Sequence, residues 1–286
     1  MGISFKQVSH LYPTNQRKQV NVAIEDINLN INKENEFVAL VGKTGSGKST
    51  LIQHMNALLL PTKGEVRIFD NTITPKKNKN PKLKAVRKRV GFVFQFPEYQ
   101  LFEETVLKDI MFAGKNFGMK NEEAECKAKE IASILKIDEK LLKKSPFDLS
   151  GGQMRKVAIA GILAYNPDII LLDEPTRGLD PKNADEIMEL FYQIHKDFNK
   201  TFVLISHDMN LVYRYASRVV VMNQGKIAYD GNKEELFKSS IYSDNHLSKP
   251  DVLQMIDYLN EKMGYHLTYD IYDEQTLLDR VVKEHE

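Results

Sequence analysis

Short apolar runs alternate with longer amphipathic stretches along most of the chain. Five runs are rich in Val, Ile, Leu and Phe and lack polar alternation: residues 37–41, 90–94, 168–172, 202–205 and 218–222. Strands that are covered on both faces show such runs, whereas the alternation in residues 24–31 is typical of a half-buried antiparallel strand. The pattern predicts an α/β fold with a mostly parallel core sheet and a smaller N-terminal antiparallel β subdomain.

Helical periodicity fills the intervals between these runs, and Pro167 and Pro181 mark a helix stop and a helix start. We expect helices at residues 49–60, 105–117, 121–136, 151–164 and 182–197, followed by two amphipathic helices at 251–263 and 275–283. The pattern therefore predicts a main domain over residues 1–245 and a C-terminal helical extension over residues 246–286. Within the main domain, a helical subdomain is expected at residues 98–165.

Composition narrows the class of protein without naming a function. With 42% hydrophobic and 28% charged residues, the chain resembles an ordinary globular protein. The single cysteine, Cys126, excludes an internal disulfide and fits a reducing compartment. The apolar runs are far shorter than the roughly 20 residues that cross a bilayer, and the first twelve residues lack the apolar core of a secretory signal. We expect a cytoplasmic protein that reaches membranes only through partners.

Charge leaves one alternative open. The net charge of +1 argues against a nucleic-acid partner, but residues 76–89 hold eight basic side chains. These could form a patch for nucleic acid or anionic lipid. The simpler interpretation, a solvated loop and helix face, is favoured.

A phosphate-binding loop follows the first apolar run directly. Residues 42–50, GKTGSGKST, lie between a predicted strand and a predicted helix, which is the context that this motif requires. Its glycines let backbone N–H groups surround phosphates, while Lys48 would reach the β/γ oxygens and Ser49 would ligate Mg²⁺. The candidate binding residues are Gly42, Thr44, Gly45, Ser46, Gly47, Lys48, Ser49 and Thr50.

Two carboxylates end a later apolar strand, at Asp173 and Glu174. A parallel strand beside the phosphate loop would place Asp173 to hold Mg²⁺ and Glu174 to polarise an attacking water as general base. An Asp-Glu pair alone fits an exposed surface equally well. Its combination with the phosphate loop predicts nucleotide hydrolysis.

The segment Leu149-Ser150-Gly151-Gly152-Gln153 opens another predicted helix. Ser150 would cap this helix, and the two glycines would expose backbone N–H groups as a second anion site. The segment resembles the signature of the ABC ATPases. In that family two ATPase domains pair head to tail, and each signature closes on ATP held by the other domain. The resemblance implies that Ser150, Gly151, Gly152 and Gln153 contact ATP bound by a partner.

Residues 3–235 resemble the family in motif order, and the resemblance implies further roles. Tyr12 matches an aromatic that stacks on adenine, although a core or hairpin tyrosine remains the alternative. Gln95 matches a residue that senses Mg²⁺ and contacts a transmembrane partner. Asp180, in Gly178-Leu179-Asp180, matches a loop that links the two ATP sites. His207 matches a switch histidine that contacts the γ-phosphate; with Glu174, Lys48 and Gln95 it completes the candidate catalytic set.

Residues 94–102 and 153–164 resemble one branch of the family, the energy-coupling factor transporters, and the second of its two ATPase paralogues. The resemblance implies an ATP-hydrolysing subunit, peripheral on the cytoplasmic face of the cell membrane, that powers uptake of a vitamin or transition-metal ion. Its expected partners are a second ATPase in a heterodimer or homodimer, a transmembrane coupling protein and, indirectly, a substrate-capture membrane subunit. Residues 96–102 would line a groove for the coupling protein, and the extension would support dimerisation.

Three alternatives remain at the level of sequence. The chain could serve another ABC importer, or act on DNA or the ribosome as a soluble ABC ATPase. Proteins of the latter kind usually carry coiled-coil insertions or two cassettes, which this sequence lacks. A regulatory nucleotide-binding module without turnover is disfavoured by Glu174 and His207.

Overall fold

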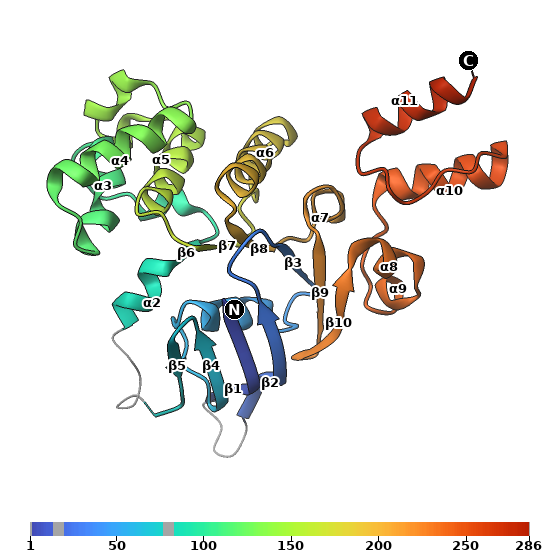
Figure 1. Ribbon diagram of the computed structural model, residues 1–286, viewed down its shortest axis with the longest axis horizontal. Coiled ribbons are helices and arrows are strands. Elements are labelled where there is room, and N and C mark those ends of the chain that lie inside the picture. Colours follow the sequence, from blue (N-terminus) through green and yellow to red (C-terminus); the bar gives the residue numbers. More distant parts are fainter. Residues whose placement is uncertain (1, 14–19, 77–82, 286) are drawn as a thin grey trace.

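The computed structural model describes residues 2–13, 20–76 and 83–285, and it places a central sheet between a helical layer and a second sheet (Figure 1). The central sheet has the strand order β10-β9-β3-β8-β7-β6. Its strands are β3 (Phe37–Val41), β6 (Val90–Val93), β7 (Ile169–Asp173), β8 (Thr201–Ile205), β9 (Arg218–Asn223) and β10 (Lys226–Asn232). All of these pair in parallel except β10, which joins β9 as an antiparallel edge strand. The predicted parallel core sheet is confirmed.

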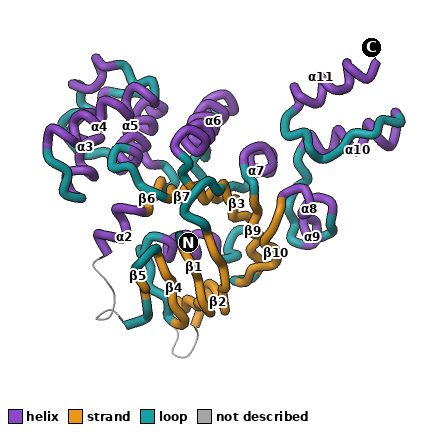
Figure 2. Tube along the Cα trace, viewed as in Figure 1, coloured by secondary structure: helices purple, strands orange, loops and turns teal. Residues whose placement is uncertain are grey.

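A smaller antiparallel sheet covers one face of the central sheet, as Figure 2 shows. It contains β1 (Ile3–Pro13), β2 (Val20–Ile31), β4 (Lys63–Ile68) and β5 (Asn71–Ile73), in the order β2-β1-β4-β5. Alternate residues of β3 pack toward the antiparallel sheet on one face and toward the helical layer on the other. Val38 and Leu40 pack with the antiparallel sheet, whereas Phe37, Ala39 and Val41 pack with the helical layer. Burial on both faces explains why this strand has no polar alternation.

The helical subdomain contains α3 (Val106–Asn116), α4 (Asn121–Ile134) and α5 (Gly151–Leu163), with short 3₁₀ turns between them. Further helices follow the core strands: α1 (Lys48–Met55), α6 (Pro181–Phe198), α7 (Met209–Tyr215), α8 (Lys233–Lys238) and α9 (Ile241–Asp244). The helix predicted at residues 49–60 ends early, at Met55. Ala57 adopts a left-handed φ of 55°, and the Asn56 side chain accepts from Leu58 N at 3.2 Å, which turns the chain out of the helix.

The basic segment ends in a short helix, α2 (Leu83–Arg89), while residues 77–82 lie outside the described ranges. Arg87 donates to the carbonyl oxygen of Ala57 at 3.1 Å. Arg89 pairs with Asp168 at 2.7 Å and lies over the Phe69 ring. These two arginines contact the rest of the fold, whereas Lys84 and Lys88 are exposed, so the predicted solvated face describes only part of the segment.

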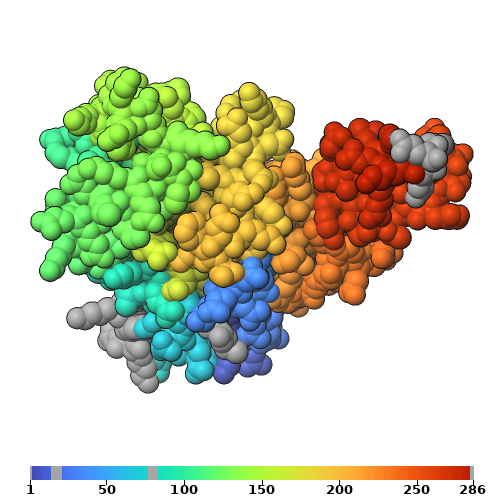
Figure 3. All heavy atoms as spheres, turned by 45° about the horizontal axis from the view of Figure 1, so that its top comes forward, coloured from blue at the N-terminus to red at the C-terminus, as the bar shows by residue number. Residues whose placement is uncertain are grey.

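The C-terminal extension contains α10 (Asp251–Met263) and α11 (Glu274–His285) and projects from the main body as a separate lobe (Figure 3). Contacts between one lysine and several tyrosines join this extension to the main domain. Lys233 donates to the Tyr213 carbonyl oxygen at 2.6 Å and lies 3.8 Å from the Tyr272 ring centroid. The Tyr213 hydroxyl donates to the Tyr269 carbonyl oxygen. Burial lowers the pKa of Lys233 to about 8.

Candidate functional site

Four neighbouring parallel strands end at one edge of the central sheet, and the candidate residues follow their carboxyl ends. The phosphate loop follows β3, His207 follows β8, Asp173 and Glu174 close β7, and Gln95 lies two residues after β6. This is where open α/β sheets bind ligands. One open pocket is lined here by Tyr12, Asn21, Val22, Ala23, Thr44, Gly45, Gly47, Lys48, Ser49, Thr50, Gln95, Asp173, Glu174, Arg177, Ile205 and His207.

The glycines of the phosphate loop give it a shape that other residues could not hold. Gly47 has a φ of 102° at the N-terminus of α1, and a Cβ there would lie 2.5 Å from the Ala23 carbonyl oxygen. Gly42 lies beneath the loop, where a Cβ would lie 2.1 Å from the Met222 carbonyl oxygen. Gly45 has no atom within 4 Å of the corresponding position. The loop therefore presents an open concave face in front of a helix N-terminus, as a phosphate site requires.

Lys48 and Ser46 place polar groups inside this loop. The Lys48 ammonium donates to the carbonyl oxygens of Gly42 at 2.6 Å and Lys43 at 2.9 Å. Burial lowers the pKa of Lys48, and the nearby charges of Glu174 and Asp173 oppose that shift. Ser46 Oγ is buried and has no hydrogen-bond partner among the described residues.

The two carboxylates after β7 differ in their surroundings. Burial raises the pKa of Asp173, the charge of Glu174 raises it further, and Lys48 opposes the shift. Glu174 adopts a left-handed φ of 48°, with its N–H bonded to the Ile205 carbonyl oxygen at 3.1 Å. Backbone strain of this kind concentrates at functional sites, and here it turns Glu174 away from the line of the strand.

Glu174 lies at the centre of a cluster of polar side chains. His207 Nε2 is 3.0 Å from Glu174 Oε1, and Arg177 Nη1 is 2.8 Å from Glu174 Oε2. The Gln95 amide fits best with its oxygen toward Arg177, where it accepts from Nε at 2.9 Å and Nη1 at 2.7 Å. In the other amide orientation, Gln95 Nε2 lies 3.3 Å from Glu174 Oε2. The structure thus brings together the predicted Gln95, Glu174 and His207, and adds Arg177.

The antiparallel sheet closes the other side of the pocket. Tyr12, at the end of β1, is 37% exposed, and its hydroxyl lies 3.4 Å from Thr50 Oγ1 of α1. The Tyr12 ring packs edge-on against His10. Asn21, Val22 and Ala23 of β2 also line the pocket. Sequence reasoning missed these three residues, because nothing in an ordinary alternating strand marks which end approaches the phosphate loop.

The signature residues lie outside this pocket. Ser150 and Gln153 form a capping box at the start of α5, in which Gln153 N donates to Ser150 Oγ and Ser150 N donates to Gln153 Oε1. Gly151 and Gly152 are exposed, with no atom within 4 Å of the position of an added Cβ. The helix N-terminus is therefore formed and open to solvent. Its predicted contact with ATP stays a prediction.

Asp180 caps α6 and also lies outside the pocket. Its carboxylate accepts from the backbone and side chain of Asn183, and these hydrogen bonds lower the pKa of Asp180. Capping is a sufficient structural role for this residue. The predicted link between two ATP sites stays a prediction.

The helical subdomain is connected to this site by an ion pair between Arg155 of α5 and Glu98. Two hydrogen bonds join their side chains, at 2.7 and 2.9 Å, and Arg155 Nη1 reaches the Arg177 carbonyl oxygen at 3.1 Å. Although burial opposes the shift, these hydrogen bonds hold the pKa of Glu98 below its usual range. Arg155 is buried and Glu98 is partly buried, so removal of one partner should cost less than the about 3–5 kcal/mol of a fully buried pair. The pair therefore links three segments to one another: the segment after Gln95, α5, and the loop after β7.

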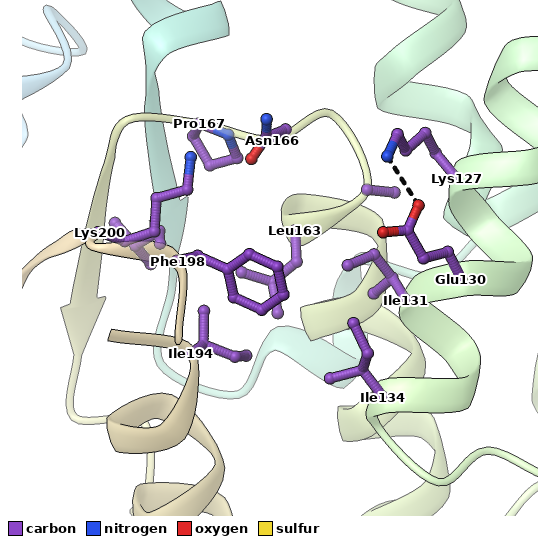
Figure 4. A pocket seen from close by; sticks show the side chains of 12 residues that line it. Lys127, Glu130, Ile131, Ile134, Leu163, Asn166, Pro167, Ile194, Phe198 and Lys200 are labelled. Atoms are coloured by element: carbon purple, nitrogen blue, oxygen red, sulfur yellow. Dashed lines mark hydrogen bonds and ion pairs between the residues drawn. The ribbon is translucent and has the colours of Figure 1, made fainter. Parts of the chain in front are cut away.

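A separate cavity of ≈ 180 Å³, lined by both apolar and charged side chains, lies where the helical subdomain meets the core (Figure 4). Leu163, Ile194 and Phe198 line it, and the Lys200 side chain lies beside it. Burial lowers the pKa of Lys200. None of the predicted site residues lines this cavity.

Comparison with known proteins decides the family. A family model described as ABC transporter matches residues 24–177. The energy-coupling factor transporter ATP-binding protein EcfA2 of Ligilactobacillus salivarius is 49% identical over 265 residues, which cover 92% of this chain and 91% of that protein. The chain belongs to the energy-coupling factor branch of the ABC transporter ATP-binding proteins. EcfA2 of Bacillus subtilis is also 49% identical, over 85% of this chain and 88% of that protein.

Solved structures agree with membership of the ABC transporter family. The structure of cbiO1 from Clostridium perfringens, described as part of the ABC transporter complex cbiONQ, covers 89% of this chain and 98% of its own, with 30% identity and a TM-score of 0.72. The ATP-binding cassette MJ0796, solved as a dimer in a post-hydrolysis state with ADP and Pi, covers 80% and 98%, with 33% identity and a TM-score of 0.69. The family, its branch and its ABC-type ATPase class, all predicted from the motifs, are confirmed.

Within residues 2–13, 20–76 and 83–285, no helix combines the length and apolar character that crossing a bilayer requires.

Proposed function

We propose that this member of the energy-coupling factor branch binds and hydrolyses ATP at the described pocket, on the cytoplasmic face of the cell membrane. Through separate membrane subunits it powers uptake of a vitamin or a transition-metal ion. One observation carries the proposal: a single pocket combines the phosphate loop, a carboxylate pair and His207 at the carboxyl edge of the sheet. The names of its relatives, which are transporter ATP-binding proteins, support the transport role.

The loop residues bind the triphosphate in this proposal. Gly45 leaves room for the β- and γ-phosphates against the backbone N–H groups, and Lys48 neutralises their charge from within the loop. Tyr12 offers an exposed ring at the pocket edge for stacking on adenine.

The residues beside the phosphates fit Mg²⁺. Asp173, whose pKa is raised by burial, would be stabilised by a cation, and Ser49 and Gln95 add oxygen donors to the same pocket. The described residues contain no cluster of three or more acidic, His or Cys side chains that could hold a metal alone. Mg²⁺ usually binds through one or two protein oxygens and substrate phosphates, so this donor set suits it. When bound, the ion would neutralise charge that develops on the phosphates.

Catalysis is assigned to Glu174 and His207. Glu174 would accept a hydrogen bond, and then a proton, from the water that attacks the γ-phosphate. His207 holds one oxygen of Glu174 at 3.0 Å and orients the carboxylate. We further propose that a second ATPase completes the site, since Ser150, Gly151 and Gly152 present an open helix N-terminus away from this chain's own phosphate loop.

The transmembrane coupling protein is proposed to dock beside the segment after Gln95. Of this segment, Tyr99 is 84% exposed and Phe102 is 57% exposed, and Phe102 packs edge-on against the exposed Phe112 of α3. Contiguous exposed aromatic side chains mark interaction sites. Leu101, which was predicted to line the groove, is instead buried in the core of the helical subdomain.

Co-purification tests the transport role and this surface together. A tagged chain, extracted from membranes in detergent, should recover an integral membrane protein and a second ATPase. Tyr99→Asp should reduce recovery of the membrane protein at least about fivefold and spare the ATP affinity of the chain, because Tyr99 packs little within it. Met263→Asp, at an exposed apolar side chain at the end of α10, is the matched control and should retain the membrane protein. Recovery of ribosomes or DNA in place of membrane proteins would reject the proposed function.

We propose that the extension contributes to pairing with the second ATPase. Between α10 and α11 lies an apolar groove, lined by Met255, Tyr258, Leu278 and others, and these three side chains are 46–61% exposed. Apolar exposure of this kind favours burial against a partner. Leu278→Asp should weaken association of the two ATPases about tenfold or more in analytical ultracentrifugation. Lys262→Asp, on the exposed surface of the same lobe, should leave it unchanged, and an equal loss in both variants would contradict the assignment.

A further inference from the structure

Arg177 occupies a position beside the catalytic carboxylate that neither the motifs nor the proposed function explains. Its guanidinium contacts Glu174 Oε2 at 2.8 Å, while His207 contacts the other oxygen. The same guanidinium reaches the Gln95 amide oxygen through two N–H groups. A planar cation with several donors can bridge two acceptors in this way. Arg177 therefore connects the two residues that the proposed function assigns to water and Mg²⁺.

This bridge competes with an attacking water for hydrogen-bonding positions on Glu174. A general base must lie within hydrogen-bond reach of the attacking water, with an oxygen facing it. Here the side of Glu174 that faces Gln95 is occupied by the Arg177 guanidinium, and the opposite oxygen is engaged by His207. Movement of the guanidinium would free positions on Glu174 Oε2 and on the Gln95 amide oxygen for a water.

The backbone of Arg177 is held by hydrogen bonds, whereas its side chain is largely exposed. Its N–H donates to the Glu174 carbonyl oxygen at 3.1 Å, and its own carbonyl oxygen accepts from Arg155. The side chain, in contrast, is 59% exposed and can swing into solvent. Ion pairs at such exposure are weak, so release requires only modest competing contacts.

The loop that carries Arg177 adjoins both proposed partner surfaces. An added Cβ at Gly178 would lie 3.2 Å from the Phe96 ring, so the loop packs on the segment proposed to contact the membrane partner. Asp180, three residues after Arg177, belongs to the loop that the family resemblance assigns to linking the two ATP sites. Closure at either surface would act on the backbone next to Arg177.

We propose that Arg177 is a latch that holds Glu174 and Gln95 in a resting arrangement and releases them when the second ATPase and the membrane partner close. The latch rests on the proposed function, because it regulates the same site. It restrains hydrolysis by the free ATPase pair and links turnover to assembly of the transporter.

The test compares the ATPase pair alone with the complete transporter, using full-length Arg177→Ala. Steady-state turnover of Mg²⁺-ATP by the pair alone should rise about three- to tenfold, the effect expected when a partly exposed ion pair and its hydrogen bonds are lost. Turnover by the complete transporter should stay within about twofold, and ATP affinity measured by calorimetry should also stay within about twofold. Arg177→Lys keeps the charge without the planar bridge and should give an intermediate increase.

Lys6→Ala provides the matched control, since Lys6 forms a surface ion pair with Glu65 in the antiparallel sheet, away from the pocket. It should leave both turnover values unchanged. Unchanged or lower turnover by the Arg177→Ala pair would overturn the latch, and a large decrease would show that Arg177 supports the reaction instead. Failure of the proposed function is distinguishable, because Glu174→Gln would then leave hydrolysis intact whatever Arg177→Ala does.

Discussion

Replacement of Glu174 by Gln is expected to lower ATP turnover by about 10²- to 10⁴-fold while ATP binding remains nearly intact. General-base help to an attacking water has this magnitude, and an amide cannot accept the proton. The substitution preserves the size of the side chain and can keep a hydrogen bond to His207, so the site should not collapse. Steady-state hydrolysis and nucleotide affinity should be measured on the same preparation of the assembled ATPase pair.

Lys48→Ala is the contrasting variant. Lys48 lies inside the phosphate loop and carries the cation nearest to the expected phosphates, so its loss should weaken binding itself. Turnover should then fall together with affinity. Hydrolysis at the wild-type rate by the Glu174→Gln pair would show that the catalytic assignment is wrong.

Ser150→Arg should stop turnover at the partner's ATP site and leave this chain's own ATP affinity largely unchanged. Ser150 is exposed at the N-terminus of α5 and does not line the pocket that contains Lys48. A bulky cation there would block phosphate approach and oppose the positive end of the helix dipole. Loss of the capping box costs about 1 kcal/mol, so the fold should survive.

Combinations of variants show whether the signature of this chain contacts ATP bound by the partner or ATP bound by the same chain. Ser150→Arg paired with a partner disabled at its own catalytic glutamate should retain one intact composite site, because both changes affect the partner's ATP. Ser150→Arg and Glu174→Gln together in this chain should remove both sites. Single-turnover hydrolysis on the assembled complexes distinguishes the two combinations. Equal residual activity in both would refute the head-to-tail arrangement.

The ion pair between Glu98 and Arg155 gives a physical reason for two sequence features of the energy-coupling factor branch. Glu98 belongs to the segment after Gln95. Arg155 is the second residue after the signature and follows Met154. In the fold these side chains form one ion pair in which only Arg155 is fully buried, and Arg155 also contacts the carbonyl oxygens of Pro175 and Arg177. The pair connects the proposed membrane-partner surface with the loop after Glu174, so movement at one can reach the other.

The sequence by itself determined the sheet class and most of the pocket. Parallel strands buried on both faces appear as uninterrupted apolar runs, which is why the five runs agree with β3, β6, β7, β8 and β9 to within one residue at each end. The phosphate loop was recognisable because its glycines and Lys48 stand between a strand and a helix. Strand ends also marked Asp173, Glu174 and His207, since carboxyl ends of parallel strands share one edge.

Only the tertiary structure decided which distant segments meet. Arg89 resembled part of a solvated basic run, but the packing of β6 beside β7 pairs it with Asp168. Leu101 resembled part of an exposed groove, yet it is buried in the same hydrophobic cluster as residues of α3 and α5. Arg177 lies only three residues from Glu174, but its second contact, with Gln95, depends on strand order. Such contacts join residues about 80 positions apart, and local hydrophobic periodicity carries no information on pairings at that separation.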